Sequence, residues 1–147
     1  MKITICSDHR GFHLKSELVK KMAEKELLFE DYGCFNEERC DYPAFALKVA
    51  EATRDNKCDF GVVICGSGDG VAITANKVKG IRCVCARNVL HVKRAREHVN
   101  INVLALAAEE TNVKEAFEMI QMLISTEFLY GRYEDRIKEI EHYEKRR

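Results

Sequence analysis

The residues around Cys65 are those in this chain whose types and spacing could do chemistry. Cys65 ends the apolar run 60–65, the glycine-rich segment 66–70 follows at once, and residues 70–78 then have a helical pattern. A turn of this kind presents several backbone N–H groups to a negative charge. A thiol beside those groups has its thiolate form favoured. A base next to a group of oxyanion-stabilising donors is what proton removal beside a carbonyl requires.

Asp8 and His9 are a second pair of chemically capable residues. They follow the apolar run 2–6 and precede a helical pattern over 11–26. One interpretation makes both of them polar contacts to a substrate. The alternative is that Asp8 caps the helix and His9 is solvated.

His98 shares one face of a predicted helix with His91 and Arg94, because the three are spaced at helical intervals. Near a helix C-terminus the dipole would favour the cationic form of its imidazole. A catalytic histidine and a simple helix cap are both compatible with this position.

Arg132 and Arg136 are four residues apart in the last predicted helix, so they also share a face. Two guanidinium groups arranged in this way can clamp a phosphate. The alternative is a solvated helix face in which Glu134 and Asp135 are their partners.

The elements that must position these residues alternate between strand and helix. Continuous apolar runs predict buried parallel strands, and helical patterns lie between and after them. The predicted strands are 2–6, 27–32, 60–65, 81–86 and 102–107, and the predicted helices are 11–26, 44–54, 70–78, 88–98, 113–126 and 133–147.

This alternation predicts an α/β fold, a Rossmann-like, doubly wound, parallel five-stranded sheet with flanking helices and a C-terminal helix. In a strand order of the flavodoxin type, strands 1 and 3 are neighbours, and ligands bind beyond their carboxyl ends. We therefore expect Asp8 and His9 to lie beside Cys65. The thin apolar stripe of the C-terminal helix suggests packing on a partner subunit.

Length and composition indicate a single domain over residues 1–147. Lys+Arg and Asp+Glu both number 24, so a net charge of zero argues against a dedicated nucleic-acid binder. No apolar stretch approaches the roughly 18 residues of a membrane span. The chain starts directly on a strand-like segment, and we expect a cytoplasmic protein without a signal peptide.

The chain has seven cysteines, and none of them forms a CxxC pair or has zinc-finger spacing with histidine. This pattern predicts reduced thiols, most of them in the core, and no metal site. It also argues against a thiol-redox protein.

Several short motifs give the chain a resemblance to the ribose-5-phosphate isomerase B family, which includes the galactose-6-phosphate isomerase subunits. Their order and spacing extend through nearly all 147 residues. They are Ser7-Asp8-His9-x-Gly11-Phe12, Asp41-Tyr42-Pro43, Ile64-Cys65-Gly66-Ser67-Gly68, Ala75-Asn76-Lys77 with Gly80-Ile81-Arg82, Arg96-Glu97-His98 leading to Asn102-Val103-Leu104-Ala105, and Gly131-Arg132-x-x-x-Arg136.

The resemblance implies an isomerase that interconverts aldose and ketose phosphates, above all ribose 5-phosphate and ribulose 5-phosphate, through a cis-enediolate. It implies a homodimer or homotetramer with active sites built from two subunits, and no metal or organic cofactor. Cys65 resembles the base that moves a proton between C1 and C2. The turn 66–70 resembles the hole for the enediolate oxygen, with Ser67 where the family usually has threonine.

The resemblance also implies roles for residues outside this turn. His98 with Asp8 resembles the pair that assists ring opening. The implied substrate contacts are the phosphate ligands His9, Arg132 and Arg136, the pocket wall Tyr42, the turn residues Gly66, Gly68, Asp69 and Gly70, and Asn100.

Three positions depart from the family pattern. Val99 replaces an amide that contacts the sugar, Glu109 stands where many members have an arginine, and Asp69 occupies a usually apolar position in the turn. These departures keep two alternatives open. One is an isomerase of another sugar phosphate, such as a hexose 6-phosphate or a tetrose phosphate. The other is a weakly active or non-catalytic sugar-phosphate-binding paralogue.

Overall fold

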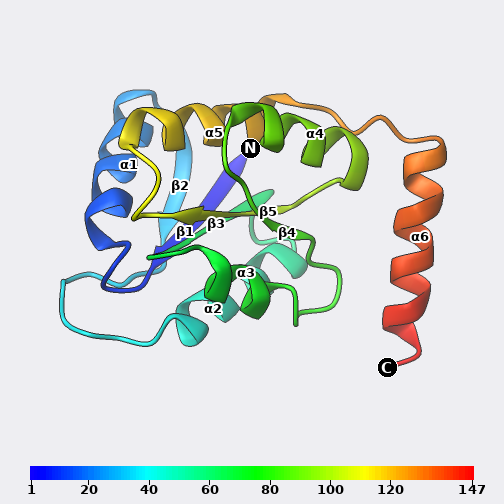
Figure 1. Cartoon of the computed structure of the whole chain (residues 1–147), viewed down its shortest axis with the longest axis horizontal. Helices are drawn as coiled ribbons and strands as arrows, with labels where there is room; N and C mark the ends of the chain where they lie inside the picture. The colour runs from blue at the N-terminus through cyan, green and yellow to red at the C-terminus, as the bar shows by residue number, and fades with distance from the viewer.

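Strands and helices alternate along the chain in the computed structural model, which describes all 147 residues (Figure 1). The strands are β1 (Lys2–Ser7), β2 (Leu28–Asp31), β3 (Phe60–Cys65), β4 (Cys83–Cys85) and β5 (Val103–Ala107). The helices are α1 (Phe12–Glu24), α2 (Tyr42–Arg54), α3 (Asp69–Ala75), α4 (Val89–Val99), α5 (Val113–Ser125) and α6 (Arg132–Lys145). The predicted element types and their order are confirmed.

The five strands form one parallel sheet in the order β2-β1-β3-β5-β4. The predicted contact between β1 and β3 is confirmed, but the flavodoxin-type order is wrong at the other edge, where β5 rather than β4 pairs with β3. Burial explains the difference. Every residue of β5 is buried, as a central strand requires, whereas the three-residue β4 is partly exposed and suits an edge.

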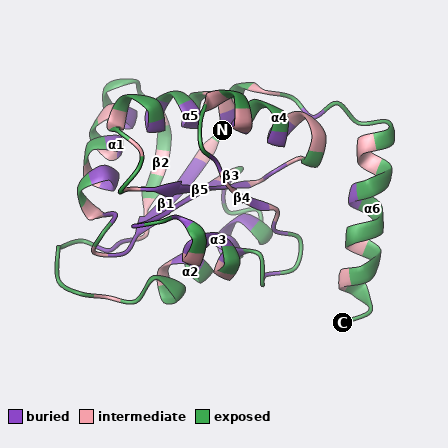
Figure 2. Ribbon diagram, in the orientation of Figure 1, coloured by how far each residue is buried: buried purple, intermediate pink, exposed green.

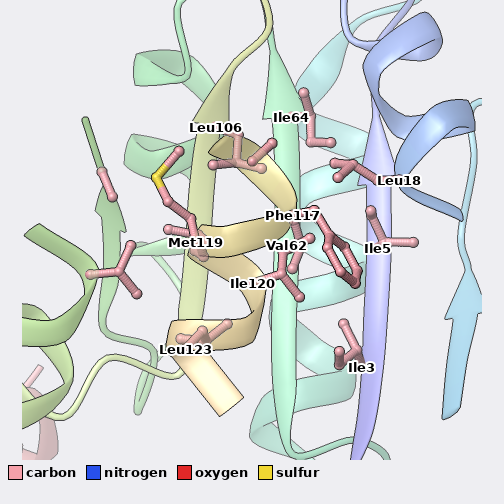
Figure 3. Packing of buried hydrophobic residues seen from close by; sticks show 14 of the residues in the cluster. Ile3, Ile5, Leu18, Val62, Ile64, Leu106, Phe117, Met119, Ile120 and Leu123 are labelled. Carbon is pink, nitrogen blue, oxygen red and sulfur yellow. The ribbon is translucent and has the colours of Figure 1, made fainter. Parts of the chain in front are cut away.

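Helices cover both faces of the sheet, as the doubly wound prediction requires. In Figure 1, α1, α4 and α5 lie on one face, and α2 and α3 lie on the other. Successive strand residues point to opposite faces. Val62 therefore packs toward Phe117 and Ile120 of α5 (Figure 3), whereas Val63 belongs to the second apolar cluster, under α2 and α3.

A buried lysine anchors the long loop between β2 and α2. The Lys15 side chain is 1% exposed, and its Nζ donates to both Asp31 carboxylate oxygens at 2.6 and 2.7 Å and to the Cys34 carbonyl at 2.6 Å. A buried ammonium group needs such partners to offset its lost hydration. The pattern of apolar residues gave no sign of this ion pair.

The last helix, α6, stands apart from the layered body, at the end of the molecule opposite α1 (Figure 1). Most of α6 is coloured as exposed in Figure 2. Ile137 is its only buried residue, and Ile140 and Tyr143 are exposed apolar side chains. Its C-terminal part is held by the Gly80 N–H, which donates to Glu144 Oε2 at 3.0 Å. None of the helices is both long and apolar enough to cross a membrane.

Candidate active site

The thiol of Cys65 lies at the carboxyl end of the central strand. Strand β3 is paired on both sides, with β1 and β5, so Cys65 is only 4% exposed. The backbone N–H of Gly68 donates to Cys65 Sγ at 3.2 Å. Gly68 has a φ of +77° and lies so close to β5 and Cys85 that a Cβ would be 2.5 Å from Cys85 Sγ. A glycine is therefore required where an amide is to reach the thiol.

The side chains of Ser67 and Asp69 are at the exposed edge of this turn. Ser67 Oγ accepts a hydrogen bond from the Asp69 N–H at 3.3 Å. Both residues, with Cys85 and Arg87, line a cavity of about 300 Å³ beyond β4 and β5. Since Asp69 is exposed, water weakens the interactions of its carboxylate with other charges.

Cys85 is a second thiol beside the same turn, and its S–H donates to the Ser67 carbonyl at 3.7 Å. Burial, followed by the nearby Asp69 carboxylate, raises the pKa of Cys85. It is therefore held as a neutral thiol and is a poor competitor for the role of base.

Tyr42, at the start of α2, forms a wall on the other side of the turn. Its ring lies against Gly70, where a Cβ would be 2.5 Å from Tyr42 Cζ. Gly70 thus leaves room for the aromatic ring, which places Tyr42 beside the glycine-rich turn.

The structure brings Asp8 to the strand that carries Cys65, as the sequence predicted. The Asp8 N–H donates to the Ile64 carbonyl at 3.1 Å, and the carboxyl group is buried. One carboxylate oxygen accepts the Gly11 N–H at 3.0 Å. Asp8 therefore makes a hydrogen bond at the start of α1, as the alternative capping role predicted. Its second carboxylate oxygen has no hydrogen bond within the chain.

The backbone of the loop between β2 and α2 fixes the His9 ring. His9 Nδ1 lies 3.1 Å from the Cys40 carbonyl oxygen and 3.3 Å from the Cys40 N–H nitrogen. Its Nε2 has no hydrogen-bond partner in the chain and is free to contact a ligand. The loop that positions His9 is the one that Lys15 anchors.

One charged pair at this edge was missed by the sequence analysis. Arg10 Nη2 lies 2.7 Å from Glu109 Oε1, above Gly66. The position of Arg10 directly after His9 could have marked it as a residue near the site. Its salt bridge to a residue 99 positions away could not be predicted, because it depends on the order of the strands.

A second group of predicted residues surrounds Tyr133, and we call His98, Arg132, Tyr133 and Arg136 the Tyr133 cluster. His98 and Tyr133 stack, with ring centroids 4.6 Å apart. Arg132 Nη2 donates to the Tyr133 hydroxyl at 3.2 Å, and both guanidinium groups lie over the ring, at 5.1 Å for Arg132 and 5.8 Å for Arg136. The hydrogen bond that Arg132 donates to Tyr133 raises the pKa of Arg132, which remains cationic.

Asn100 follows α4 in a left-handed conformation, and its side chain already has a partner. Asn100 Oδ1 accepts from Arg96 Nη1 at 2.6 Å. Burial lowers the pKa of Arg96, and no carboxylate is among its hydrogen-bond partners. Because Oδ1 is occupied, the predicted substrate contact of Asn100 would be made by the Nδ2 N–H groups of its side chain.

Within one chain, the Tyr133 cluster and the residues around Cys65 lie at opposite ends of the strands of the sheet. Helix α4 starts after the carboxyl end of β4 and runs back, so His98 lies five residues before the start of β5 and near the amino ends of the strands. The structure therefore does not bring His98 to Asp8 inside a single chain. No cluster of three or more His, Cys, Asp or Glu side chains could hold a metal ion.

Comparisons with known proteins agree along nearly the whole chain. A sequence profile described as Ribose/Galactose Isomerase matches residues 3–140. Ribose-5-phosphate isomerase B of Escherichia coli is 35% identical over 146 residues, which cover 99% of this chain and 98% of that one. The structure of Clostridium thermocellum ribose-5-phosphate isomerase B is 40% identical, with a TM-score of 0.96 and 99% of each chain covered.

A solved structure with a bound sugar phosphate is also similar. It is ribose-5-phosphate isomerase B of Mycoplasma genitalium with ribulose 5-phosphate, 35% identical to this chain, with a TM-score of 0.92. The match covers 98% of this chain and 96% of that one.

Proposed function

The chain belongs to the ribose/galactose isomerase family, and on that premise we propose that it interconverts ribose 5-phosphate and ribulose 5-phosphate. The observation that carries this proposal is the Cys65 thiol at the carboxyl end of β3, with the Gly68 N–H 3.2 Å away. A buried thiol facing a turn of backbone amides supplies a base and an oxyanion site together. The names of the Escherichia coli and Mycoplasma genitalium relatives support the choice of substrate.

Cys65 is the proposed base of the isomerisation. Its thiolate takes the proton from C2 of the open-chain aldose, and the C–H electrons form a double bond to C1 as the carbonyl becomes an enediolate. The O2 hydroxyl proton passes to O1, and return of the C2 proton from the Cys65 thiol to C1 restores a carbonyl at C2 and gives the ketose. Because the electrons stay within the substrate, the reaction needs no redox cofactor.

Backbone amides of the turn 66–70 are the proposed donors to the enediolate oxygen. Gly66, Gly68 and Gly70 allow the backbone to approach closely, and the Ser67 hydroxyl lies at the exposed edge of the turn. Preorganised donors of this type stabilise charge that develops in a transition state. Tyr42 is the proposed wall of the sugar pocket, with Asp69 and the free N–H group of Asn100 as outer contacts.

We propose that a second copy of the chain completes the site. The Tyr133 cluster supplies a histidine and two cations at the amino edge, whereas Cys65 and Asp8 lie at the carboxyl edge. In a two-fold dimer, α6 of one subunit can reach the carboxyl edge of the other. The partner's His98 would then open the sugar ring with Asp8, and Arg132 and Arg136 would bind the phosphate with His9.

All seven cysteines are free thiols, which supports a reducing compartment, and we place the protein in the cytoplasm. A homodimer is the smallest assembly that completes the site, and a homotetramer built from two such dimers would contain the same sites.

A coupled assay over tetrose, pentose and hexose phosphates tests the proposed reaction. We expect the highest kcat/KM with ribose 5-phosphate. A higher kcat/KM with another sugar phosphate would assign that substrate instead. Val99 is the reason to test this, because it replaces an amide that contacts the sugar and is exposed beside His98. Binding of sugar phosphates without turnover would identify a non-catalytic paralogue.

A further inference from the structure

Arg10 and Glu109 form an ion pair directly over the turn that carries the proposed base. A Cβ added at Gly66 would lie 2.8 Å from Glu109 Oε1 and 3.3 Å from Arg10 Cδ, so the pair lies directly against the turn. The Glu109 N–H also donates to the Gly66 carbonyl at 3.1 Å. The backbone of Glu109 is thereby tied to the turn, and its carboxylate pairs with the Arg10 guanidinium.

We propose that Arg10 binds the phosphate of the substrate and that Glu109 positions Arg10 for this contact. The proposal rests on the proposed function and assigns a specificity-determining residue to the same site. Arg10 comes from the chain that supplies Cys65, whereas Arg132 and Arg136 would come from the partner.

The donors of Arg10 support this assignment. Its side chain is 61% exposed, and Glu109 at 2.7 Å is its only ion-pair partner. Nη2 makes that contact, which leaves the Nε and Nη1 N–H groups unused within the chain. A guanidinium group matches the geometry of a phosphate better than a lysine does. Arg10 is also next to His9, whose Nε2 is free.

The charges at this edge indicate why such a cation is needed. Asp8, Asp69, Glu109 and Glu110 place four carboxylates around the turn or its cavity. A phosphate monoester carries close to two negative charges at pH 7. Without a nearby cation these carboxylates would repel it. Arg10 neutralises Glu109 and keeps its remaining donors available for a phosphate.

The Arg10–Glu109 pair is weak enough to rearrange. Glu109 is 52% exposed, and pairs exposed to water on both sides contribute little to stability. Arg10 can therefore share its guanidinium between Glu109 and a phosphate without disturbing the fold. Glu109 limits the positions that this long side chain samples before the substrate arrives.

The test compares Arg10→Gln, Arg10→Lys and Glu109→Gln with Arg54→Gln, a control at an exposed pair on α2. For ribose 5-phosphate, Arg10→Gln should raise KM about tenfold or more with little change in kcat. Arg10→Lys should recover part of the loss. Glu109→Gln should raise KM by up to about fivefold, because only positioning is lost. Arg54→Gln should leave KM within about twofold of the wild-type value.

Two results would overturn the inference: an unchanged KM in Arg10→Gln, or a lower KM in Glu109→Gln. Failure of the proposed function is a separate outcome, since the wild-type protein would then turn over no sugar phosphate. In that case calorimetric titration of ribose 5-phosphate into wild-type protein and Arg10→Gln decides the inference. Weaker binding to the variant supports it, and equal binding rejects it.

Discussion

His98 and Tyr133 stack almost face to face, with ring centroids 4.6 Å apart and ring planes 9° apart. The stack joins the last turn of α4 to the first turn of α6. Because both guanidinium groups of the Tyr133 cluster lie over the same ring, one tyrosine fixes the relative positions of the proposed ring-opening and phosphate-binding residues. The cluster is thus assembled in a single chain, although the thiol that it would serve is at the opposite edge of the sheet.

Mixing two inactive variants tests the shared site. In a two-fold dimer of Cys65→Ser with His98→Asn, one of the two sites has both wild-type residues. Random exchange of subunits should therefore restore about a quarter of the wild-type sites. Activity should appear when the two variants are unfolded and refolded together, and each variant refolded alone is the control. No recovery in the mixture would place both residues in the same subunit's site.

If His98 opens the sugar ring, the loss of kcat in His98→Asn should be larger for a cyclic substrate than for an open-chain one. His98→Asn should lower kcat for ribose 5-phosphate by about 100-fold, within the usual range for loss of an acid–base group. Erythrose 4-phosphate cannot close a furanose ring because its O4 is esterified, so its turnover should fall by less than about threefold, since no ring-opening step is needed. Equal losses with both sugars would assign His98 to the proton transfer between carbons.

Loss of a phosphate ligand should affect binding more than turnover. Removal of one member of a buried charge pair typically costs about 2–5 kcal/mol, and Arg136→Ala should therefore raise KM for ribose 5-phosphate by roughly 30-fold or more. Lys138→Ala is the matched control, because Lys138 lies two residues further along α6 and pairs only with Glu134, at 3.3 Å. If both variants have the same KM, Arg136 belongs to a solvated helix face.

Local patterns predicted the elements of the fold and the position of Asp8 next to the strand that ends at Cys65. Strand runs and the glycine-rich turn are properties of short segments, and β1 and β3 are neighbours in the observed sheet. The position of β5 beside β3 was not predicted, because it depends on how several helices pack. The same is true of the Arg10–Glu109 pair, whose members come together only through that strand order.

The Lys15–Asp31 pair should contribute strongly to stability. Lys15→Met leaves a partly buried carboxylate and the Cys34 carbonyl without their cation, and it should lower the free energy of unfolding by about 3 kcal/mol. Urea unfolding measures the loss. Lys20→Met removes an exposed lysine paired with Glu17 and should cost less than about 1 kcal/mol. Similar losses in both variants would contradict a special role for the buried pair.

The most direct test of the account is the turnover of Cys65→Ser beside that of Cys85→Ser. The two thiols flank the same turn, but only Cys65 accepts the Gly68 N–H, and burial raises the pKa of Cys85. Steady-state assays on ribose 5-phosphate should show kcat lowered by about 100-fold or more in Cys65→Ser, within the usual range for loss of an acid–base group. Cys85→Ser should keep kcat within about threefold of wild type, because a neutral thiol there moves no proton. Near-wild-type turnover in Cys65→Ser would contradict the central claim that this thiol is the base.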